Sequence, residues 1–546
     1  MDNNISIMLS TPSIKIGNIQ HNLQQILNHI QIAKSDDIDL IIFGKNALTS
    51  NHIGSMVHHN SIISAIDTAI DTIVATTQGT NLTIILHSYC TYKRSLEQYT
   101  LIIHNGIVNY HTKPMVDTNI NSHKLTICLD IPRIRTYNTN IVVCIHDDVV
   151  KYDNIILDTL LTYKLPNTLA IVGMCINESL SRGLSDSSKI VVHQGQVMTN
   201  DIKQDYTVTD IEISSDEHKT YRLNHNIISK SHNPQLPFVS NNKHHLNSII
   251  NILQQSTYRR VKETHNKGVV VGISGGLDSS FVLALSRSIQ LRYPDFGEIY
   301  AVNMHTHNTS DLSRLNANRL IKSCNAIHID IPISNQVATH LHDIGHSGAH
   351  DITYQNAHAR RRSSILLDLS NMYKVLHLGT GDMSEIALGW STYGGDQLAQ
   401  FNPNSNLTKT MLRVLLPHIS RQLDNRDLQQ IAQDIVNAPI SPELKPNQKT
   451  EEELGPYDFF DFVMYYFVFQ RQPIASVYRL CQQHFDNIDS NTIKKHLSTF
   501  VDRFFVNQFK RLYGCDGIRV QEYDLNNLII RSDFDPSIYH QELNNI

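Results

Sequence analysis

The stretch VVVGISGGLDSSFVLAL, residues 269–285, decides the fold of the second half of the chain. The β-branched run from Val269 to Ile273 predicts a buried strand, and the apolar pattern after Ser280 predicts a helix. The Ser274–Ser280 loop between them gathers backbone N–H groups and the positive end of the helix dipole around one point. Its glycines let the backbone approach a ligand without a Cβ clash, so the loop suits a polyphosphate.

The spacing of this loop separates it from the two commonest phosphate-binding motifs. It fits neither Gly-x-x-x-x-Gly-Lys-Ser nor Gly-x-Gly-x-x-Gly. Ser-Gly-Gly-x-Asp-Ser instead resembles the pyrophosphate loop of the ATP pyrophosphatases, which split ATP into AMP and pyrophosphate to adenylate a substrate. The alternative is a glycine-rich turn with no ligand, but the serines and the aspartate favour a phosphate site.

The composition predicts a soluble globular protein of no more than about three domains. The chain has 546 residues, 41% of them hydrophobic and 18% charged, and its net charge of −5 gives no reason to expect nucleic-acid binding. No apolar run approaches the roughly 20 residues of a membrane span, and the N-terminus lacks a signal-peptide pattern. The seven cysteines form no C-x-x-C pair, so we expect a reduced, cytoplasmic setting.

The hydrophobic pattern predicts two α/β domains joined by a linker. In the N-terminal domain, residues 1–200, Asn105-Gly106 predicts a hairpin turn. Residues 201–243 are polar and weakly periodic, which indicates the linker. The buried strands expected in the N-terminal domain are Ile5–Leu9, Leu40–Phe43, Leu82–Leu86, Leu101–His104, Ile141–Ile145 and Ala170–Val172.

The second domain, residues 244–546, alternates helices and strands around the loop. An amphipathic helix is expected from Leu246 to Val261, and strands are expected at Ile299–Met304 and Ala326–Ile331, on either side of a helix at Ser310–Ser323. This alternation predicts a doubly wound parallel sheet with ligands at the C-terminal ends of its strands. Toward the C-terminus the pattern turns helical and aromatic.

Further stretches narrow the family. They are TYQNAHARRRSSILLDLSN (353–371), LGTGDMSEIALGWSTYGGD (378–396), LTKT (407–410), SPEL (441–444), KTEEELGPYDFFDF (449–462) and RFFVNQFKR (503–511). Together with the loop they resemble NAD⁺ synthetases of the long, glutamine-dependent type over residues 245–520. The resemblance implies an α/β fold: a nitrilase-like α-β-β-α sandwich followed by a doubly wound sheet like that of the adenine nucleotide alpha hydrolases.

The resemblance also implies a ligase that makes NAD⁺ from deamido-NAD⁺. ATP adenylates the nicotinate carboxylate, pyrophosphate leaves, and ammonia displaces AMP. The implied ATP-binding residues are Gly272, Ile273, Ser274, Gly275, Gly276, Leu277, Asp278, Ser279 and Thr380. The residues implied to bind deamido-NAD⁺ are Asn356, Glu385, Trp390, Ser391, Thr392, Tyr393 and Lys510.

Charged residues in these segments have further expected roles. Asp278 and Glu385 carry hard oxygen ligands suited to Mg²⁺, which bridges phosphates. Lys409 and Asp396 lie in matching segments and are expected to order the loop that closes over the phosphates. Arg360 is a candidate charge partner, as is Arg362 two residues on, although a salt bridge on the helix surface is the alternative.

Two of these assignments compete with a plainer one. Trp390 is the only tryptophan, and a lone aromatic residue is usually core, but its place in GWSTY after an acidic turn favours stacking on the nicotinate. Lys510 lies on an amphipathic helix, where a lysine is ordinarily solvated, and only its place in QFKR favours a substrate contact.

The N-terminal segments resemble a nitrilase-like glutaminase, in which a Glu/Lys/Cys triad releases ammonia from glutamine. Lys113 and Cys144 stand where the triad lysine and nucleophile belong, but Lys45 stands in place of the glutamate. A protonated lysine cannot accept the proton of the thiol. We therefore expect a degenerate glutaminase domain, an inert Cys144 and ammonia as nitrogen donor, with Asp147 and Glu178 left open as substitute bases.

Three alternatives remain open from the sequence. They are a fully glutamine-dependent synthetase with an altered triad, another ATP pyrophosphatase such as a GMP synthetase or a tRNA thiolase, and a decayed scaffold. The intact loop and Glu385 argue against a scaffold, and the lack of a C-x-x-C pair argues against a thiolase. The expected partners are deamido-NAD⁺, ammonia or glutamine, and further copies of the chain, without nucleic acid or membrane.

Overall fold

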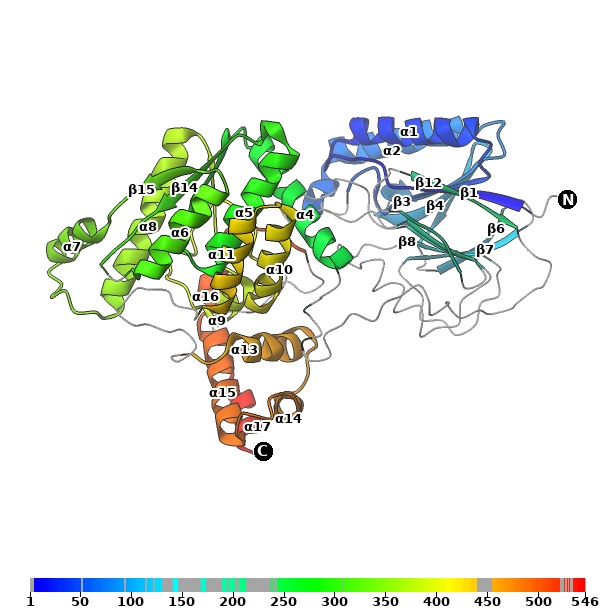
Figure 1. Cartoon of the computed structure of the whole chain (residues 1–546). Coiled ribbons are helices and arrows are strands. Elements are labelled where there is room, and N and C mark those ends of the chain that lie inside the picture. Colours follow the sequence, from blue (N-terminus) through cyan, green and yellow to red (C-terminus); the bar gives the residue numbers. More distant parts are fainter. Residues whose placement is uncertain are drawn as a thin grey trace. The chain divides into compact units, whose positions relative to one another are not determined.

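The computed structural model divides the chain into two compact units, Met1–Lys230 and Ser231–Ile546, shown in Figure 1. Among the helices it describes, none is long and apolar enough to cross a membrane. The residues described are 4–50, 53–92, 95–112, 115–120, 123–129, 141–145, 168–172, 189–193, 196–201, 206–212, 236, 239, 243–307, 309–438, 454–520, 525, 528, 530 and 534–545.

The first unit contains two six-stranded sheets. Their strand orders are β12-β1-β2-β3-β4-β5 and β11-β10-β9-β8-β7-β6. The elements of the first sheet and its helices are β1 (Asn4–Ser10), α1 (Ile19–Ser35), β2 (Leu40–Phe43), η1 (Gly54–His58), α2 (Asn60–Thr76), β3 (Thr83–Tyr92), β4 (Ser95–His104), β5 (Ile107–His111) and β12 (Tyr206–Glu212). The second sheet is built from β6 (Met115–Ile120), β7 (His123–Leu129), β8 (Ile141–Ile145), β9 (Thr168–Val172), β10 (Lys189–His193) and β11 (Gln196–Asp201).

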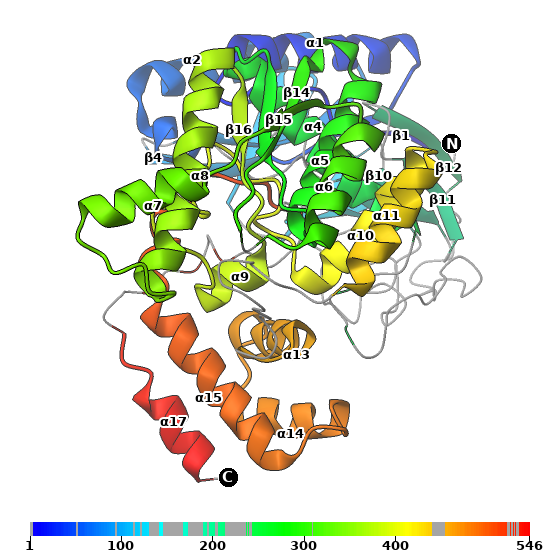
Figure 2. The same ribbon diagram turned by 60° about the vertical axis from the view of Figure 1, so that its left-hand side comes forward.

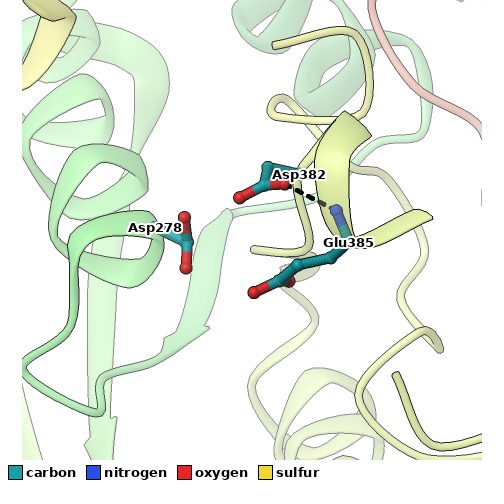
Figure 3. A group of neighbouring side chains, drawn as sticks. All are labelled: Asp278, Asp382 and Glu385. Carbon is teal, nitrogen blue, oxygen red and sulfur yellow. Dashed lines mark hydrogen bonds between the residues drawn. The ribbon is translucent and has the colours of Figure 1, made fainter. Parts of the chain in front are cut away.

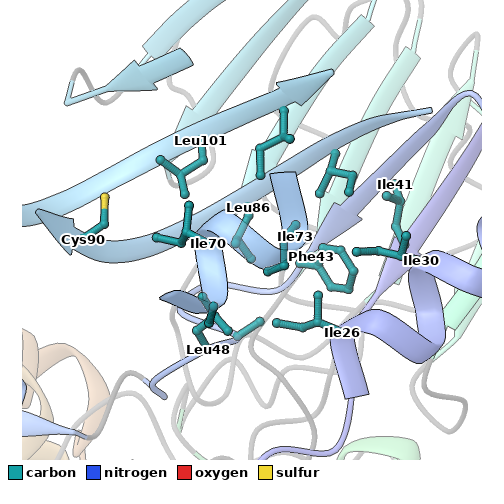
Figure 4. Close-up of a cluster of buried hydrophobic side chains, with 14 of the residues drawn as sticks. Ile26, Ile30, Ile41, Phe43, Leu48, Ile70, Ile73, Leu86, Cys90 and Leu101 are labelled. Carbon is teal, nitrogen blue, oxygen red and sulfur yellow. The ribbon is translucent and has the colours of Figure 1, made fainter. Parts of the chain in front are cut away.

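The central strand β2 explains why the layers form. All four of its residues are buried, so both of its faces need apolar partners. Phe43 shares a hydrophobic cluster with Ile26 of α1, and Figure 4 shows these side chains pointing toward each other. On the opposite face, Ile42 shares a cluster with Val143 of β8 in the second sheet. Because successive side chains of a strand point to opposite faces, one face of β2 packs against a helical layer and the other packs against the second sheet.

The predicted hairpin is present, but the predicted linker is wrong in its first part. Asn105 (φ 46°) and Gly106 (φ 75°) form the turn between β4 and β5, in the left-handed conformations that such a turn needs. Residues 206–212, expected in the linker at 201–243, form β12, which pairs antiparallel with β1 at the edge of the first sheet. The apolar residues of this edge strand change phase, with Tyr206 and Val208 in one row and Ile211 in the other, so the segment reads as weakly periodic.

The second unit is built on a four-stranded parallel sheet in the order β15-β14-β13-β16. Its strands are β13 (Gly268–Gly272), β14 (Glu298–Asn303), β15 (Ile327–Asp330) and β16 (Leu376–Leu378). Val270 and Val302 cluster with Leu366 of α8 on one face, and Figure 2 shows α5 and α6 beyond the other. The surrounding helices are α4 (Lys243–Glu263), α5 (Leu277–Arg292), η3 (Pro294–Phe296), α6 (Asp311–Ser323), α7 (Ser334–Asp343), α8 (Ile352–Tyr373), α9 (Met383–Leu388), α10 (Lys409–Gln422) and α11 (Arg426–Asn437).

Helices at the C-terminal end of this unit form an aromatic core of their own. Phe460, Phe500 and Phe504 are buried in one cluster that also includes Leu388 of α9. This cluster joins the C-terminal helices to the segment that carries Glu385. The helices are α13 (Tyr457–Val463), the π-helix η4 (Met464–Phe469), α14 (Ile474–His484), α15 (Ser490–Val506), α16 (Gln508–Arg511) and α17 (Ser537–Asn544).

Candidate functional site

The loop singled out in the sequence lies at the C-terminal end of β13. β13 ends at Gly272 and α5 begins at Leu277, so the turn between them faces the start of the helix. Gly275 has φ +85°, and a Cβ there would lie 2.4 Å from the carbonyl oxygen of Ser313. Ser274 Oγ accepts a hydrogen bond from Gly276 N at 3.2 Å, which holds the turn. Only glycine fits at position 275, and the serine side chain supports the turn.

Three carboxylates from two helices face one another beside this loop. Asp278 comes from the first turn of α5, and Asp382 and Glu385 come from the start of α9 (Figure 3). One oxygen of each lies within 4.8 Å of the others. Asp382 is the N-cap of α9, where its Oδ1 accepts the backbone N–H of Glu385 at 2.9 Å. Asp382 was not among the predicted site residues, although an acidic residue three positions before a glutamate is a capping signal.

The side chain of Lys409 ends among these carboxylates. Its Nζ lies 2.8 Å from Asp278 Oδ2, 2.6 Å from Asp382 Oδ2 and 2.8 Å from Glu385 Oε1, and the residue is fully buried. Burial lowers its pKa, but the carboxylates raise it, and the net shift is upward. Burial raises the pKa of Glu385 to about 7, an effect that Lys409 opposes. The cluster therefore holds an ammonium ion and an excess of acidic groups.

The carboxylate cluster also fits a divalent metal ion. Asp278 Oδ1 is buried and has no hydrogen-bond partner among the described residues. Three carboxylates that converge on one point are the hard oxygen donors that Mg²⁺ prefers. Asp382 thus joins the two predicted ligands, Asp278 and Glu385, as a candidate third.

The cluster opens into a pocket with an empty volume of about 780 Å³, part of it open to solvent. Among the predicted residues, those that line it are Asp278, Thr380, Glu385, Ser391, Asp396 and Lys510. The lining residues that sequence reasoning missed are Gly379, Gly381, Ile386, Gln397, Asn402, Ser405, Arg511, Gly514 and Cys515. Gly379, Gly381, Ile386 and Arg511 lie inside motifs quoted above, and Gln397 follows one directly. The other four carry no signal of their own.

Trp390 and Lys510 have protein partners in this structure. The ring of Trp390 packs against the C-terminal aromatic core, with the Arg503 guanidinium carbon 4.9 Å from its centroid. Lys510 and two arginines of the C-terminal helices donate to carbonyl oxygens at the end of α9. The bonds are Lys510 Nζ to Gly389 O (2.7 Å) and Ser391 O (2.8 Å), Arg511 Nη1 to Ala387 O (2.8 Å), and Arg503 Nε to Leu388 O (3.1 Å). These cations cap the negative end of α9, the helix that carries Glu385.

The remaining residues expected to bind deamido-NAD⁺ form one network between α8 and the segment after α9. Thr392 Oγ1 donates to Asn356 Oδ1 at 2.9 Å, and Thr392 N donates to Asp396 Oδ1 at 2.6 Å. Arg360 Nε donates to the carbonyl oxygen of Tyr393 at 3.2 Å. Arg362 Nε donates to a backbone carbonyl as well, that of residue 304, at 3.4 Å.

The predicted glutaminase residues are only partly described. Cys144 is fully buried on β8, and Lys45 is half-buried just after β2. Lys113, Asp147 and Glu178 lie outside the described residues.

A glycine loop ends a central parallel strand, and carboxylates and a buried lysine meet there, which is the arrangement that the resemblance to ATP pyrophosphatases leads us to expect. Residues 249–500 match the family model described as NAD synthase. Over this stretch the chain is similar to NAD synthases, and the resemblance seen in the sequence is confirmed there.

Relatives and solved structures agree with this assignment. The glutamine-dependent NAD(+) synthetase of Mycobacterium leprae is 31% identical over 230 residues, 39% of this chain and 34% of that one. That of Acinetobacter baylyi is 28% identical over 274 residues, 49% of this chain and 47% of that one. The matches thus span about a third to a half of the length of these curated relatives.

The crystal structure of a glutamine-dependent NAD(+) synthetase from Cytophaga hutchinsonii superposes with a TM-score of 0.76 at 16% identity, covering 99% of each chain. That likeness concerns the fold. It confirms the predicted α/β fold, in which a sandwich of two sheets is followed by a doubly wound parallel sheet.

Proposed function

We propose that this protein is an NAD⁺ synthetase that amidates deamido-NAD⁺, converts ATP to AMP and pyrophosphate, and takes ammonia as its nitrogen donor. One observation carries the proposal: Asp278 of the Ser274–Ser280 loop and Glu385 line one pocket inside the stretch that matches NAD synthase. The names of the curated relatives support the same reaction.

In the first step, an oxygen of the nicotinate carboxylate attacks the α-phosphorus of ATP. The bond from this phosphorus to the bridging oxygen breaks, and pyrophosphate leaves. N–H groups at the start of α5 stabilise the charge that develops on the pyrophosphate. Asp278, Asp382 and Glu385 would hold Mg²⁺, which supplies positive charge to the phosphates when it is bound.

In the second step, ammonia attacks the carbonyl carbon of the acyl adenylate. The bond between this carbon and the phosphate oxygen breaks, AMP leaves, and the surplus proton passes to water. Asp396 and Lys510 line the pocket and supply one charge of each sign beside the substrate. Burial raises the pKa of Asp396 and lowers that of Lys510, so both charges are held at a cost that a polar ligand offsets.

The ammonia dependence is supported by Lys45, which stands where a glutaminase needs a carboxylate base. The alternative, glutamine hydrolysis by an altered triad, is favoured by the names of the relatives. A homo-oligomer is part of the proposal, on the resemblance alone.

The test supplies deamido-NAD⁺, ATP and Mg²⁺ with either ammonium or glutamine and follows NAD⁺ by chromatography. We expect NAD⁺ from ammonium and at most a trace from glutamine. The matched variant is Cys144→Ala, which removes only the remnant nucleophile and should leave both rates unchanged. Equal rates from both donors, with the glutamine rate lost in C144A, would overturn the ammonia dependence. No NAD⁺ from either donor would overturn the synthetase.

A further inference from the structure

The position of Lys409 is more specific than that of a structural ion pair. Its Nζ contacts one oxygen from each of the three carboxylates that fit a metal ion, at 2.6–2.8 Å. Its stem is buried, and the ring of Tyr457 lies 5.2 Å from Nζ on another side. We propose that Lys409 is the resident cation of this site and competes with the divalent metal for the same carboxylates. This inference rests on the proposed function, which supplies the metal.

Lysine and metal exclude each other for geometric and electrostatic reasons. Mg²⁺ binds oxygen ligands at about 2.1 Å. A divalent ion on these three oxygens would therefore lie only a few ångströms from Nζ, inside a buried site where like charges repel strongly. Metal binding through these oxygens requires the ammonium group to leave.

The backbone of Lys409 is held by neighbouring side chains. Lys409 N donates to Ser384 Oγ at 2.8 Å, and Ser384 Oγ donates to Asp461. Thr410 N donates to the same carboxylate at 3.1 Å. Thr408 caps the helix by accepting the N–H of residue 411. The start of α10 is thus fixed by side chains behind it, so an exchange with a metal ion would move only the four-carbon stem of Lys409.

The exchange has a purpose in the reaction. Before ATP arrives, the ammonium group holds three carboxylates in place that would otherwise repel one another. ATP brings phosphates into the pocket that Asp278 and Glu385 line, and these phosphates accept both the metal and the displaced ammonium. The protein should therefore bind a divalent cation weakly alone and more tightly with nucleotide.

The experiment measures Mn²⁺ binding without nucleotide by electron paramagnetic resonance. The affinity of Lys409→Met for Mn²⁺ should be roughly tenfold or more higher than that of the wild type, which is the usual size of a coupling between two binding sites. Mn²⁺ should also raise the Tm of K409M more than that of the wild type, because it replaces the missing cation. Lys262→Met removes an exposed lysine paired with Asp295 at 3.0 Å and should change neither quantity.

Equal or weaker Mn²⁺ binding by folded K409M would overturn the proposal, because the metal would then sit on other oxygens, such as Asp278 Oδ1. If K409M does not fold, Asp382→Asn and the double variant D382N/K409M decide. Asparagine keeps the N-cap of α9, and the double variant should bind Mn²⁺ tighter than D382N alone. A wild type that makes no NAD⁺ overturns the proposed function instead, whatever the Mn²⁺ result.

Discussion

Asp461 lies behind the site, and its charge state can be tested by the variant Asp461→Asn. The carboxylate is 1% exposed and accepts hydrogen bonds from Ser384 Oγ, from Thr410 N at 3.1 Å and from Thr410 Oγ1 at 2.8 Å. Burial favours the protonated acid, and these donors favour the carboxylate. Burial dominates, and it raises the pKa of Asp461 to about 6 from an ordinary 3.8.

The magnitude follows from linkage. A carboxyl group whose pKa is raised on folding binds more protons in the folded protein between pH 3.8 and about 6. Its contribution to stability is therefore fully present below pH 3.8 and is lost as the pH rises through 6. When the pH falls from 7.5 to 4.5, the free energy of unfolding of the wild type should rise by about 2 kcal/mol relative to that of D461N, which cannot titrate at this position.

Urea unfolding of both proteins at each pH measures this difference, because effects shared by the two chains cancel. Trp390 is the only tryptophan and lies in the second unit, so its fluorescence reports on the unit that contains Asp461. The control is Asp368→Asn, which alters an exposed carboxylate on α8 and should leave the pH dependence unchanged. A flat difference between wild type and D461N would refute the reasoning, since the donors would then outweigh burial.

Three further outcomes are expected. Gly275→Ala should abolish ATP binding in calorimetry, because its Cβ would lie 2.4 Å from the Ser313 carbonyl oxygen; retained binding would show that the loop can shift. Burial lowers the pKa of His377 to about 4. The free energy of unfolding of the wild type should therefore fall by about 3 kcal/mol, relative to His377→Leu, as the pH falls from 6.5 toward 4. An equal pH dependence of the two proteins in urea unfolding would contradict this. Arg503→Met should change the emission of Trp390 and cost about 1–2 kcal/mol in urea unfolding; unchanged emission would argue against the cation–π contact.

The fold was largely predictable because apolar periodicity encodes buried faces directly. β2 spans Leu40–Phe43 as predicted, since a four-residue run buried on both sides has no polar position. α6 begins directly after Ser310, whose side chain caps it. The strand at 206–212 was missed because an edge strand exposes one row of residues and tolerates polar side chains there. Periodicity therefore fails at the boundary of the sheet, where burial is incomplete.

The site was predictable as a set of segments but not as a set of side-chain directions. The loop and the segment TGDMSE each carry a motif, and the structure brings Asp278 and Glu385 together. Asp382 has a local role, because its Oδ1 accepts the backbone N–H of Glu385. Nothing in the sequence indicates that its other oxygen, Oδ2, contacts Lys409. A residue with a satisfied local role gives no sequence signal for a second role in tertiary structure.

Lys510 is a second residue whose tertiary contacts the sequence does not indicate. Its motif predicts a substrate contact, but its Nζ binds two carbonyl oxygens at the end of α9. Those carbonyls lie 121 and 119 residues away in sequence, so no local pattern connects them. The contact still bears on chemistry. A cation that caps α9 fixes the helix that presents Glu385, and the same ammonium group borders the pocket. A ligand anion there would compete with the two carbonyls for Lys510, just as a metal would compete with Lys409 for the carboxylates. In both places the protein satisfies a charged side chain with its own groups, and a ligand would have to displace those groups in order to bind.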